Sequence, residues 1–484
     1  MSFNSYEYIF AFLTITFFVY FFLNKYGLRT AAKTWLLFAS LFFYGWWNVS
    51  HLPLILSSIL FNFALGNYLA KHNSNRTITR KLLLILAIAG NVGLLCYFKY
   101  ADFFISNLNF LFNAQLDFLH LALPLAISFF TFQQIAYLVA SYNGETKQYG
   151  FLNYALFVSF FPQLIAGPIV YHKEMLPQYT NPRTKVINYE NIALGLFIFS
   201  IGLFKKAAIA DTFAVWATSG FDKAEMLTFF EAWATSLSYT FQIYFDFSGY
   251  TDMAIGSALL FNIKLPVNFN SPYKALNIQD FWRRWHITFS RFLRDHVYIP
   301  LGGNRKVEFR IYSNLMATFL IGGLWHGAGW LFLFWGFLHG LAIIIHRIWM
   351  RFDIQMNKIL AFFITFSFLN VTWVFFRAKE WQDATKVLKG MFGFSGIVLP
   401  GKLGEKMAFL QNYGIEFGSL DCDKTQIVVL LTIFFVAVFG TNSNQIINNF
   451  KFNYKSVLWS TLLFSASVLY FNRDRMREFL YFVF

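Results

Sequence analysis

Apolar runs of about 18 residues, separated by short polar segments, recur along the whole chain. That length matches an α-helix that crosses the hydrocarbon core of a bilayer, whereas a membrane β-barrel would show alternating segments of about ten residues. The pattern predicts an all-α polytopic membrane protein that forms a single domain over residues 1–484. Roughly ten to thirteen spanning or re-entrant helices are expected, at 7–23, 34–50, 52–70, 82–100, 118–142, 151–171, 192–218, 228–247, 311–334, 336–349, 359–376, 426–441 and 456–471.

Composition supports a membrane location. Hydrophobic residues make up 57% of the 484 residues, charged residues only 13%, and 66 positions are Phe. A water-soluble domain needs more polar side chains than this to cover its surface, and a disordered chain is excluded by the same figures. The N-terminus lacks the basic start and cleavage site of a signal peptide, so we expect its apolar run to be retained. The two cysteines, Cys96 and Cys422, lie in different segments and predict neither a disulfide framework nor a thiolate metal site.

The excess of basic residues predicts the orientation. A net charge of +15 is compatible with nucleic-acid binding, but in a membrane protein basic residues gather in cytoplasmic loops, and this second interpretation is favoured. Loops 24–33 and 71–81 carry Lys and Arg without acids and are expected inside, which places the N-terminus outside. Segment 401–425 has more acids than bases and fits an outside loop. The tail 472–484 follows outside by alternation, although its own three arginines favour the inside.

The largest polar insertion, residues 271–310, is expected on the cytoplasmic side, because it carries eight Lys and Arg residues against three acids. Within it, residues 280–299 place aromatic and leucine side chains at helical spacing, with arginines between them. This is the pattern of an amphipathic helix that lies at the membrane interface.

Several enzyme classes are excluded by motifs that the chain lacks. It contains no GxxxxGKS/T phosphate loop, no HExxH motif, no CxxC pair and no GxSxG serine elbow. No metal site is expected. The search for chemistry therefore turns to polar side chains within apolar runs, because burying such a group in lipid is costly unless it is paired or lines a cavity.

Two histidines lie within apolar runs. His326 stands in GGLWHGAGW, residues 322–330, where glycines allow close approach of backbones and tryptophans can wall a cavity. His339 follows in WGFLHG. A lone buried histidine is more often structural than catalytic, so the pattern alone leaves both roles open.

Two further polar features interrupt apolar runs. Gln242, Asp246 and Gly249 share one helical face, where Asp246 either orients a histidine or a water molecule, or pairs with an arginine in helix packing. The segment FFPQLIAGP, residues 160–168, breaks a helix with two prolines and a glycine, which predicts a re-entrant wall around a cavity.

Taken together, four segments resemble the membrane-bound O-acyltransferase (MBOAT) family. They are FFPQLIAGP at 160–168, YFDFSGYTDMAIG at 244–256, FWRRWHITFSRFLRDHVYIPLGGNR at 281–305 and GGLWHGAGW at 322–330. The resemblance is strongest to the bacterial branch that contains the alginate O-acetyltransferase membrane subunit (AlgI-like) and the teichoic-acid D-alanyl transferase. It implies a ring of about eleven transmembrane helices, with re-entrant and interfacial helices, around a central tunnel.

The resemblance also implies roles for individual residues. It places the family's catalytic histidine on His326, as general base toward a hydroxyl group. His286, His339 and Asp246 are candidates for an assisting role, which the sequence does not distinguish from a structural one. The expected tunnel-wall residues are Trp325, Gly327, Gln163 and Pro168. The basic residues expected along the approach of an anionic thioester are Arg283, Arg284, Arg291, Arg294, Arg305 and Lys306.

The chain ends FLYFVF, which fits the F-x-Y-x-x-F ending of the resembled systems. In those systems a tyrosine at this place is a transient acyl carrier, and the resemblance assigns that role to Tyr481. An aromatic anchor at the membrane interface is the alternative.

The function that the resemblance implies is O-acetylation of an extracytoplasmic polysaccharide by a bacterial inner-membrane enzyme. The acetyl group would pass from cytoplasmic acetyl-CoA to Tyr481, and then to an outer SGNH or esterase-like transferase that reaches the polysaccharide. D-alanyl transfer to teichoic acid is the alternative enzyme activity. A polysaccharide or lipid-linked transporter is the alternative of another class, and no nucleic-acid partner is expected.

Overall fold

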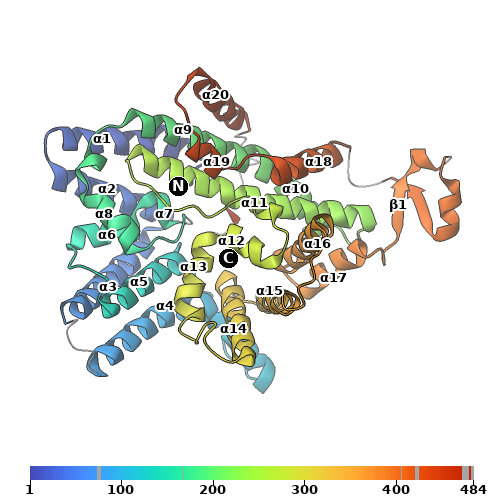
Figure 1. The fold of residues 1–484 in the computed structure, drawn as a ribbon, viewed down its shortest axis with the longest axis horizontal. Coiled ribbons are helices and arrows are strands. Elements are labelled where there is room, and N and C mark those ends of the chain that lie inside the picture. Colours follow the sequence, from blue (N-terminus) through green and yellow to red (C-terminus); the bar gives the residue numbers. More distant parts are fainter. Residues whose placement is uncertain (73–77, 166, 405, 420–423, 471–478, 481–484) are drawn as a thin grey trace.

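A computed structural model describes residues 1–72, 78–165, 167–404, 406–419, 424–470 and 479–480, which form a predominantly helical molecule (Figure 1). The all-α prediction is confirmed apart from one small sheet. The α-helices are α1 (Leu13–Lys25), α2 (Arg29–Gly45), α3 (Leu52–Lys71), α4 (Ile78–Phe112), α5 (Ile127–Asn143), α6 (Phe151–Ser159), α7 (Phe161–Leu164), α8 (His172–Thr180), α9 (Tyr189–Phe204), α10 (Asp211–Thr218), α11 (Phe229–Leu260), α12 (Ile278–Arg284), α13 (Ile287–Leu293), α14 (Glu308–His326), α15 (Trp330–Trp349), α16 (Lys358–Arg377), α17 (Trp381–Met391), α18 (Lys424–Phe439), α19 (Ser443–Asn448) and α20 (Tyr454–Leu469). The shorter 3₁₀ and π-helical turns are η1 (Glu7–Phe12), η2 (Val49–His51), η3 (Pro182–Lys185), η4 (Lys205–Ala210), η5 (Ser219–Lys223), η6 (Pro272–Lys274), η7 (Arg294–Tyr298), η8 (Gly401–Leu403) and η9 (Ala408–Tyr413).

Six helical stretches of the described residues are long and apolar enough to cross a membrane. They are Glu7–Lys25, Val49–Lys71, Ile78–Phe112, Tyr189–Lys223, Trp330–Trp349 and Lys358–Arg377. Other expected spans are shorter or broken. Residues 151–171, for example, form α6 and α7, with a break at Phe160 inside the segment whose prolines predicted an interruption.

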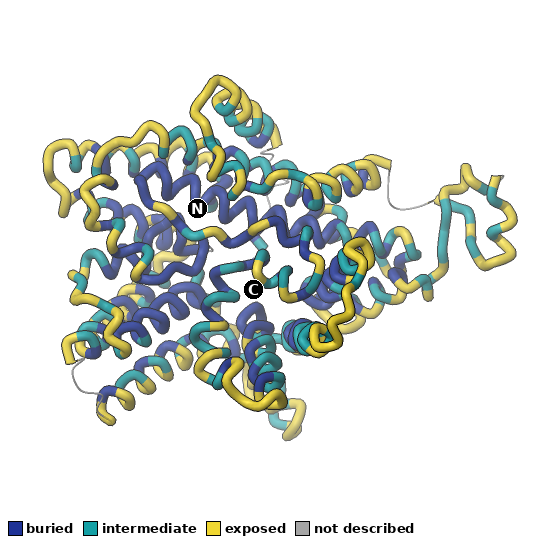
Figure 2. Tube along the Cα trace, in the orientation of Figure 1, coloured by how far each residue is buried: buried dark blue, intermediate teal, exposed yellow. Residues whose placement is uncertain are grey.

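Helix α11 is the central, buried helix of the molecule. Its 32 residues make it about 48 Å long, and nearly all of its side chains from Ala232 to Leu260 are buried. Helices α7, α9, α10, α16, α17 and α18 contact it, and Figure 2 shows buried residues following α11 through the centre of the molecule. A helix buried on every side places its polar groups against protein rather than lipid, so α11 can carry acidic residues at membrane depth.

Glycines bring α9 and α11 into close contact at two points. A Cβ atom added at Gly202 would lie 2.5 Å from the carbonyl oxygen of Gly249, and one added at Gly249 would lie 2.7 Å from the carbonyl oxygen of Gly202. Two helical turns further along, a Cβ atom added at Gly195 would lie 2.8 Å from the carbonyl oxygen of Gly256, and one added at Gly256 would lie 2.6 Å from that of Gly195. Small residues allow such backbone approach in membranes, where dispersion contacts rather than the hydrophobic effect hold helices together.

The single interfacial helix expected over 280–299 is divided into α12, α13 and η7. The break falls at His286, whose φ of +41° is left-handed and therefore ends the helical run. The aromatic face of the segment packs on protein: the ring of Phe292 stacks on that of Phe132 at 3.9 Å, and Phe289 stacks on Trp325 at 4.4 Å. The amphipathic pattern was therefore correct, but its apolar side faces the helix bundle.

A two-stranded sheet is the departure from the all-α prediction. Strands β1 (Ile397–Pro400) and β2 (Ile415–Gly418) pair in parallel, with Ile397 opposite Ile415 and Pro400 opposite Gly418. Together with the turns between them, the strands form a lobe that extends away from the helices (Figure 1). This lobe includes part of the segment 401–425 that was expected to be an outside loop.

The α9–α11 contact generates a stability prediction. Gly202→Leu is expected to lower the unfolding temperature of the purified protein by several degrees or to prevent its accumulation, because the side chain would meet the backbone of Gly249 and of Met253. The measurement is thermal unfolding in detergent, with Gly93→Leu on α4 as the control, since a Cβ atom there meets nothing within 4 Å. Equal unfolding temperatures for the two variants would contradict this account of the helix contact.

Candidate active site

His326 is the last residue of α14 and lies among aromatic rings from three other helices. The residue is 2% exposed, and its ring centroid lies 5.0 Å from that of Phe376, 5.1 Å from Trp335 and 5.3 Å from Phe289. These rings belong to α16, α15 and α13, so segments far apart in the sequence converge on one imidazole. Walls of this kind keep bulk water away and strengthen electrostatic interactions inside the site.

The end of α14 lies inside the protein, where its last backbone carbonyls require hydrogen-bond donors. Helix α4 supplies them. The Lys99 ammonium donates to the carbonyl oxygens of Trp325 at 2.6 Å and His326 at 3.3 Å, and the Tyr100 hydroxyl donates to that of Leu324 at 2.7 Å. A cation is also favoured at this end by the helix dipole. Lys99 and Tyr100 therefore hold the turn that carries His326.

The turn from α14 to α15 follows directly and depends on glycine. Gly327 has an extended backbone, and a Cβ atom added there would lie 2.1 Å from the ring of Phe332. Any larger residue would displace this ring from the turn. The tight turn leaves His326 at the junction of two antiparallel helices.

His326 borders a cavity, although it is almost completely buried. A cavity of about 60 Å³ is lined by Lys99, Trp325 and His326 together with Trp47 and residues 123–129. A volume of this size holds one or a few water molecules and no polymer. The imidazole is thus accessible to a small group.

Two larger cavities lie next to one another around the α14–α15 turn. One, of about 320 Å³, shares Lys99 with the first cavity and is also lined by Gly327, Ala328 and Phe332. The next, of about 910 Å³, shares Ala328 and Phe332 with it. The remaining lining residues of this 910 Å³ cavity are Thr218, Gln242, Gly329, Trp330, Leu331, Phe376, Arg377, Ala378, Lys379, Glu380, Trp381, Gln382 and Leu480.

The cavity of about 910 Å³ lies at the turn end of the α14–α15 hairpin, remote from residues 304–310 of the basic insertion. At the insertion end, Arg351 pairs with Glu308, and Arg347 donates to the Asn304 side-chain oxygen at 3.0 Å, so both outer ends of the hairpin are on one side. The turn at 327–329, which the cavity adjoins, lies at the opposite end. These cavities therefore lie away from residues 304–310, whereas α13 of the same insertion contacts His326 through Phe289.

The other two candidate histidines lie close to the same aromatic cluster. His339 Nδ1 accepts a hydrogen bond from the Trp282 indole at 3.2 Å. The ring of Trp335 contacts both His339, at 4.6 Å, and His326, at 5.1 Å. His286 is buried, with its ring 4.8 Å from that of Phe247. His339 and His286 thus pack around the walls of the site.

Asp246 meets a lysine, rather than the histidine or arginine considered from the sequence. Its Oδ1 atom lies 2.6 Å from Lys206 Nζ, which also lies 2.9 Å from Asp211. Its Oδ2 atom accepts a hydrogen bond from the backbone N–H of Leu480 at 3.0 Å.

Three of the six basic residues expected along the thioester approach make ion pairs instead. Arg284 donates to Asp280 at 2.9 Å, and Arg294 donates to Asp295 at 2.8 Å, a hydrogen bond that raises the pKa of the Arg294 guanidinium. Arg291 makes a two-pronged contact with Glu174 at 2.5 and 3.0 Å.

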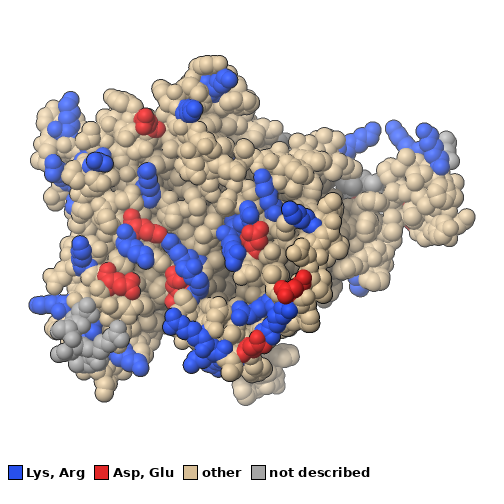
Figure 3. Space-filling model, viewed as in Figure 1, with Lys and Arg blue, Asp and Glu red and all other residues tan. Residues whose placement is uncertain are grey.

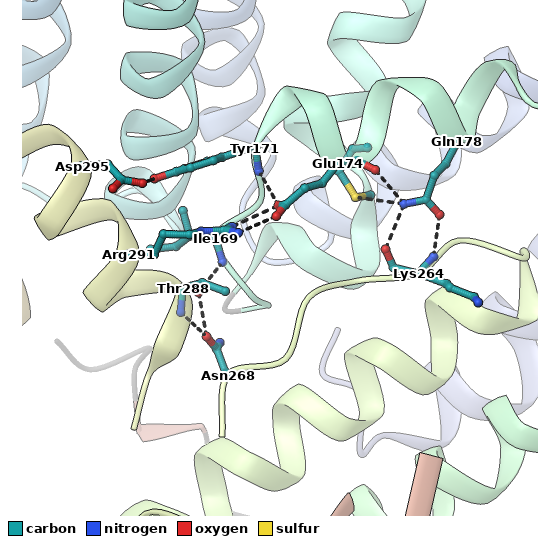
Figure 4. Close-up of polar contacts among 10 residues, drawn as sticks. Ile169, Tyr171, Glu174, Gln178, Lys264, Asn268, Thr288, Arg291 and Asp295 are labelled. Atoms are coloured by element: carbon teal, nitrogen blue, oxygen red, sulfur yellow. Dashed lines mark hydrogen bonds and ion pairs between the residues drawn. The ribbon is translucent and has the colours of Figure 1, made fainter. Parts of the chain in front are cut away.

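The Arg291 pair belongs to a wider polar network, shown in Figure 4. Its guanidinium lies 4.2 Å from the centre of the Tyr171 ring, and the Tyr171 hydroxyl donates to Asp295 at 3.2 Å. The backbone N–H of Ile169 donates to the Thr288 hydroxyl at 3.0 Å. This network ties the segment after the re-entrant break to α13, which carries one wall of the His326 site.

The other three basic residues, Arg283, Arg305 and Lys306, are exposed. In the described part of the chain they make no ion pair. Figure 3 shows Lys and Arg side chains spread over the face that carries the basic insertion, with fewer acids between them. They remain available to an anionic ligand on this side.

The expected tunnel-wall residues separate into two groups. Trp325 and Gly327 line the cavities around His326. Gln163 and Pro168 are buried away from these cavities, and the Gln163 side chain donates to the carbonyl oxygen of Phe157 at 2.6 Å. Tyr481 lies outside the described residues.

With this geometry established, comparison with known proteins decides the family. The family model for membrane-bound O-acyltransferases matches residues 87–378. The chain belongs to the membrane-bound O-acyltransferase family. It is an acyltransferase and a multi-pass membrane protein, as the resemblance in the sequence predicted.

Several individual relatives of this O-acyltransferase are similar over long stretches. It is 49% identical to the peptidoglycan O-acetyltransferase of Helicobacter pylori over 516 aligned residues, which cover 100% of this chain and 98% of the relative. It is 40% identical to the probable alginate O-acetylase AlgI of Pseudomonas aeruginosa, over 81% of this chain and 75% of that one. The teichoic acid D-alanyltransferase of Streptococcus thermophilus is 27% identical, over 48% of this chain and 59% of the relative.

Sequence reasoning missed the contribution of α4 to the acyltransferase site. Lys99 stands at the end of the apolar run 82–100, and a lysine within such a run is itself a signal of function or pairing. Lys206, in the run 192–218, carried the same signal. Their partners, the carbonyls of α14 and the carboxylate of Asp246, lie 226 and 40 positions away in the chain, beyond the reach of local patterns.

The α4–α14 contact can be tested in the acyltransferase by Lys99→Met. This variant keeps the aliphatic stem but leaves two buried carbonyls without their donor, so we expect a loss of about 1–3 kcal/mol of stability. Tyr100→Phe is expected to cost about 1 kcal/mol, because one neutral hydrogen bond is lost. Thermal unfolding in detergent is the measurement, with Lys81→Met at an exposed position of α4 as the control. An unchanged unfolding temperature for Lys99→Met would refute the capping role.

Proposed function

We propose that this protein is a peptidoglycan O-acetyltransferase of a bacterial cytoplasmic membrane, with its N-terminus outside. The observation that carries the proposal is the 49% identity with the Helicobacter pylori peptidoglycan O-acetyltransferase, which extends over the whole of this chain. The similarity to alginate O-acetylases is lower and covers less of both chains, and that to the D-alanyltransferases is lower again. Acetylation of peptidoglycan is therefore favoured over acetylation of alginate and over D-alanyl transfer.

His326 is proposed as the general base. It borders a small cavity at the end of a helix, and its aromatic walls keep the site dry. A phenol or a sugar hydroxyl is scarcely ionised at neutral pH, so it needs a base within hydrogen-bond reach to become a nucleophile. The narrowness of the cavity at His326 also argues against the transporter alternative, because a polysaccharide does not fit through about 60 Å³.

The acyl donor is proposed to be acetyl-CoA, which approaches from the basic face. Arg283, Arg305 and Lys306 are exposed on the insertion and carry charge complementary to the phosphates of coenzyme A. Arg284, Arg291 and Arg294 act instead as structural residues, through their carboxylate partners. The 910 Å³ cavity at the α14–α15 turn is the proposed exit for the acetyl group toward an outer esterase-like transferase.

The proposed transfer proceeds through Tyr481, which follows Leu480 directly in the chain. His326 accepts the phenolic proton, the phenolate oxygen attacks the thioester carbonyl, and the carbon–sulfur bond breaks. The imidazolium then returns its proton to the departing thiolate, so coenzyme A leaves as a thiol and the acetyl group is held as a tyrosyl ester. A hydroxyl of the outer transferase subsequently accepts the acetyl group and regenerates the phenol.

Loss of the base should abolish the reaction. His326→Ala is expected to reduce acetyl transfer by about 10²–10⁴-fold, which is the usual contribution of general-base catalysis. The measurement is incorporation of labelled acetate into peptidoglycan in cells, normalised to the amount of membrane-inserted protein. His72→Ala, at an exposed position near the end of α3, is the matched control and should behave as wild type. Wild-type acetylation by the His326 variant would disprove the proposed role.

The carrier role has its own test. Tyr481→Phe keeps the aromatic ring and removes the nucleophilic oxygen, so acetate should no longer reach peptidoglycan, while the protein accumulates normally. Phe482→Leu, next to it in the tail, serves as the control for a general disturbance of this segment. Normal peptidoglycan acetylation by Tyr481→Phe would show that the acetyl group travels by another route. Label that reached teichoic acid or another glycan instead would reassign the acceptor.

A further inference from the structure

Residues Phe479 and Leu480 near the C-terminus lie against the central helix α11. Phe479 is 2% exposed, and its ring stacks on that of Tyr250 with a centroid separation of 4.2 Å and an interplanar angle of 23°. The ring of Phe247 lies 5.7 Å away on the same helix. Tyr250 and Phe247 of α11 therefore form an aromatic contact surface for the Phe479 side chain.

The next residue of the tail is held by its backbone. The N–H of Leu480 donates to Asp246 Oδ2 at 3.0 Å, while Asp246 Oδ1 lies 2.6 Å from Lys206 Nζ. Lys206 also pairs with Asp211 at 2.9 Å. The side chains of these three charged residues are at most 6% exposed.

The Asp246 carboxylate has two oxygens to satisfy in a region that water reaches poorly. Lys206 lies between the carboxylates of Asp246 and Asp211 and contacts one oxygen of each. A buried carboxylate is stable only when its oxygens receive hydrogen bonds or a counter-ion. Lys206 satisfies Oδ1 of Asp246, and the tail supplies a donor to Oδ2. The contact uses a backbone group, so it recognises a peptide rather than a particular side chain.

The position of the cluster places the tail at the cavity of about 910 Å³. Leu480 lines this cavity together with Gln242, which lies one helical turn before Asp246 on α11. Ala328 and Phe332, from the turn after His326, line the same space. A tail held at Asp246 therefore lies beside a cavity at the turn that follows the candidate base.

We propose that Asp246, Tyr250 and Phe247 form a binding site for the C-terminal tail of this chain, with Lys206 as the positioning residue that orients the Asp246 carboxylate. The site takes an aromatic side chain at position 479 and the peptide N–H at position 480. This inference concerns the tail that the proposed function uses as its acyl carrier, but the docking of the tail is measured independently of acetyl transfer.

The test exploits the fact that proline has no backbone N–H. Phe479→4-fluorophenylalanine in the full-length protein in nanodiscs provides a ¹⁹F resonance, which stacking on Tyr250 shifts away from its position in a free peptide. Leu480→Pro is expected to lower the ratio of docked to undocked signal about ten- to hundredfold, the effect of losing a hydrogen bond to a charged group. Leu480→Ala retains the N–H and should keep the docked signal.

A double-mutant cycle separates the lost hydrogen bond from other effects of proline. Asp246→Ala combined with Lys206→Met and Asp211→Asn removes all three charges of the cluster, leaves neither a lysine nor a carboxylate without its partner, and should also release the tail. Leu480→Pro should then cause no further loss in that background. A docked signal that persists in Leu480→Pro, or independent losses from the two sets of substitutions, would overturn the binding site.

Acetylation measured on the same variants addresses the proposed function separately. Tail release in Leu480→Pro together with loss of peptidoglycan acetylation supports both the binding site and the carrier role. Tail release with normal acetylation supports the binding site and refutes the carrier role. Persistent docking refutes the binding site, whatever the acetylation shows.

Discussion

The structure of the site depends on a helix that ends inside the protein. The last carbonyl groups of α14 would be costly to leave without donors at membrane depth, and Lys99 and Tyr100 of α4 provide those donors. Because side chains from α4 donate hydrogen bonds to these last carbonyls, the chain can turn at once into α15 and leave small cavities beside the turn. His326 occupies this end, so one set of hydrogen bonds determines both where the helix stops and where the imidazole lies.

Buried charge in this protein is distributed in small, compensated groups. Lys206 is placed between Asp246 and Asp211, and the neighbouring Lys205 contacts Asp252 at 2.7 Å and the Ser443 hydroxyl at 2.8 Å. Both groups lie at the junction of η4 with α11, and each connects α11 to a segment near the C-terminus: α19 through Ser443, and the tail through Leu480. The central helix therefore uses its acidic residues to attach later parts of the chain.

Exposed basic side chains and the cavities lie at different ends of the α14–α15 hairpin. Arg305 and Lys306 are exposed next to Asn304, which contacts the outer end of α15, while Arg284, Arg291 and Arg294 of the same insertion pair with carboxylates. The cavities beside His326 open at the opposite end of the α14–α15 hairpin. In the proposed function, acetyl-CoA would approach from the basic insertion and the acetyl group would leave at this opposite end.

The sequence by itself determined the fold class, the family and the identity of the candidate base, because these depend on local signals. Apolar runs of spanning length require helices, prolines in 160–168 require a break, and the GGLWHGAGW motif that contains His326 is contiguous in the chain. Tertiary structure alone decided which polar groups meet. The partners of Lys99, Arg291 and Asp246 come from segments far away in the sequence, and periodicity specifies the face of a helix but not the helix that packs against it. For the same reason the sequence showed the amphipathic pattern of 280–299 but not that its apolar side faces protein, nor that a left-handed residue at His286 divides it.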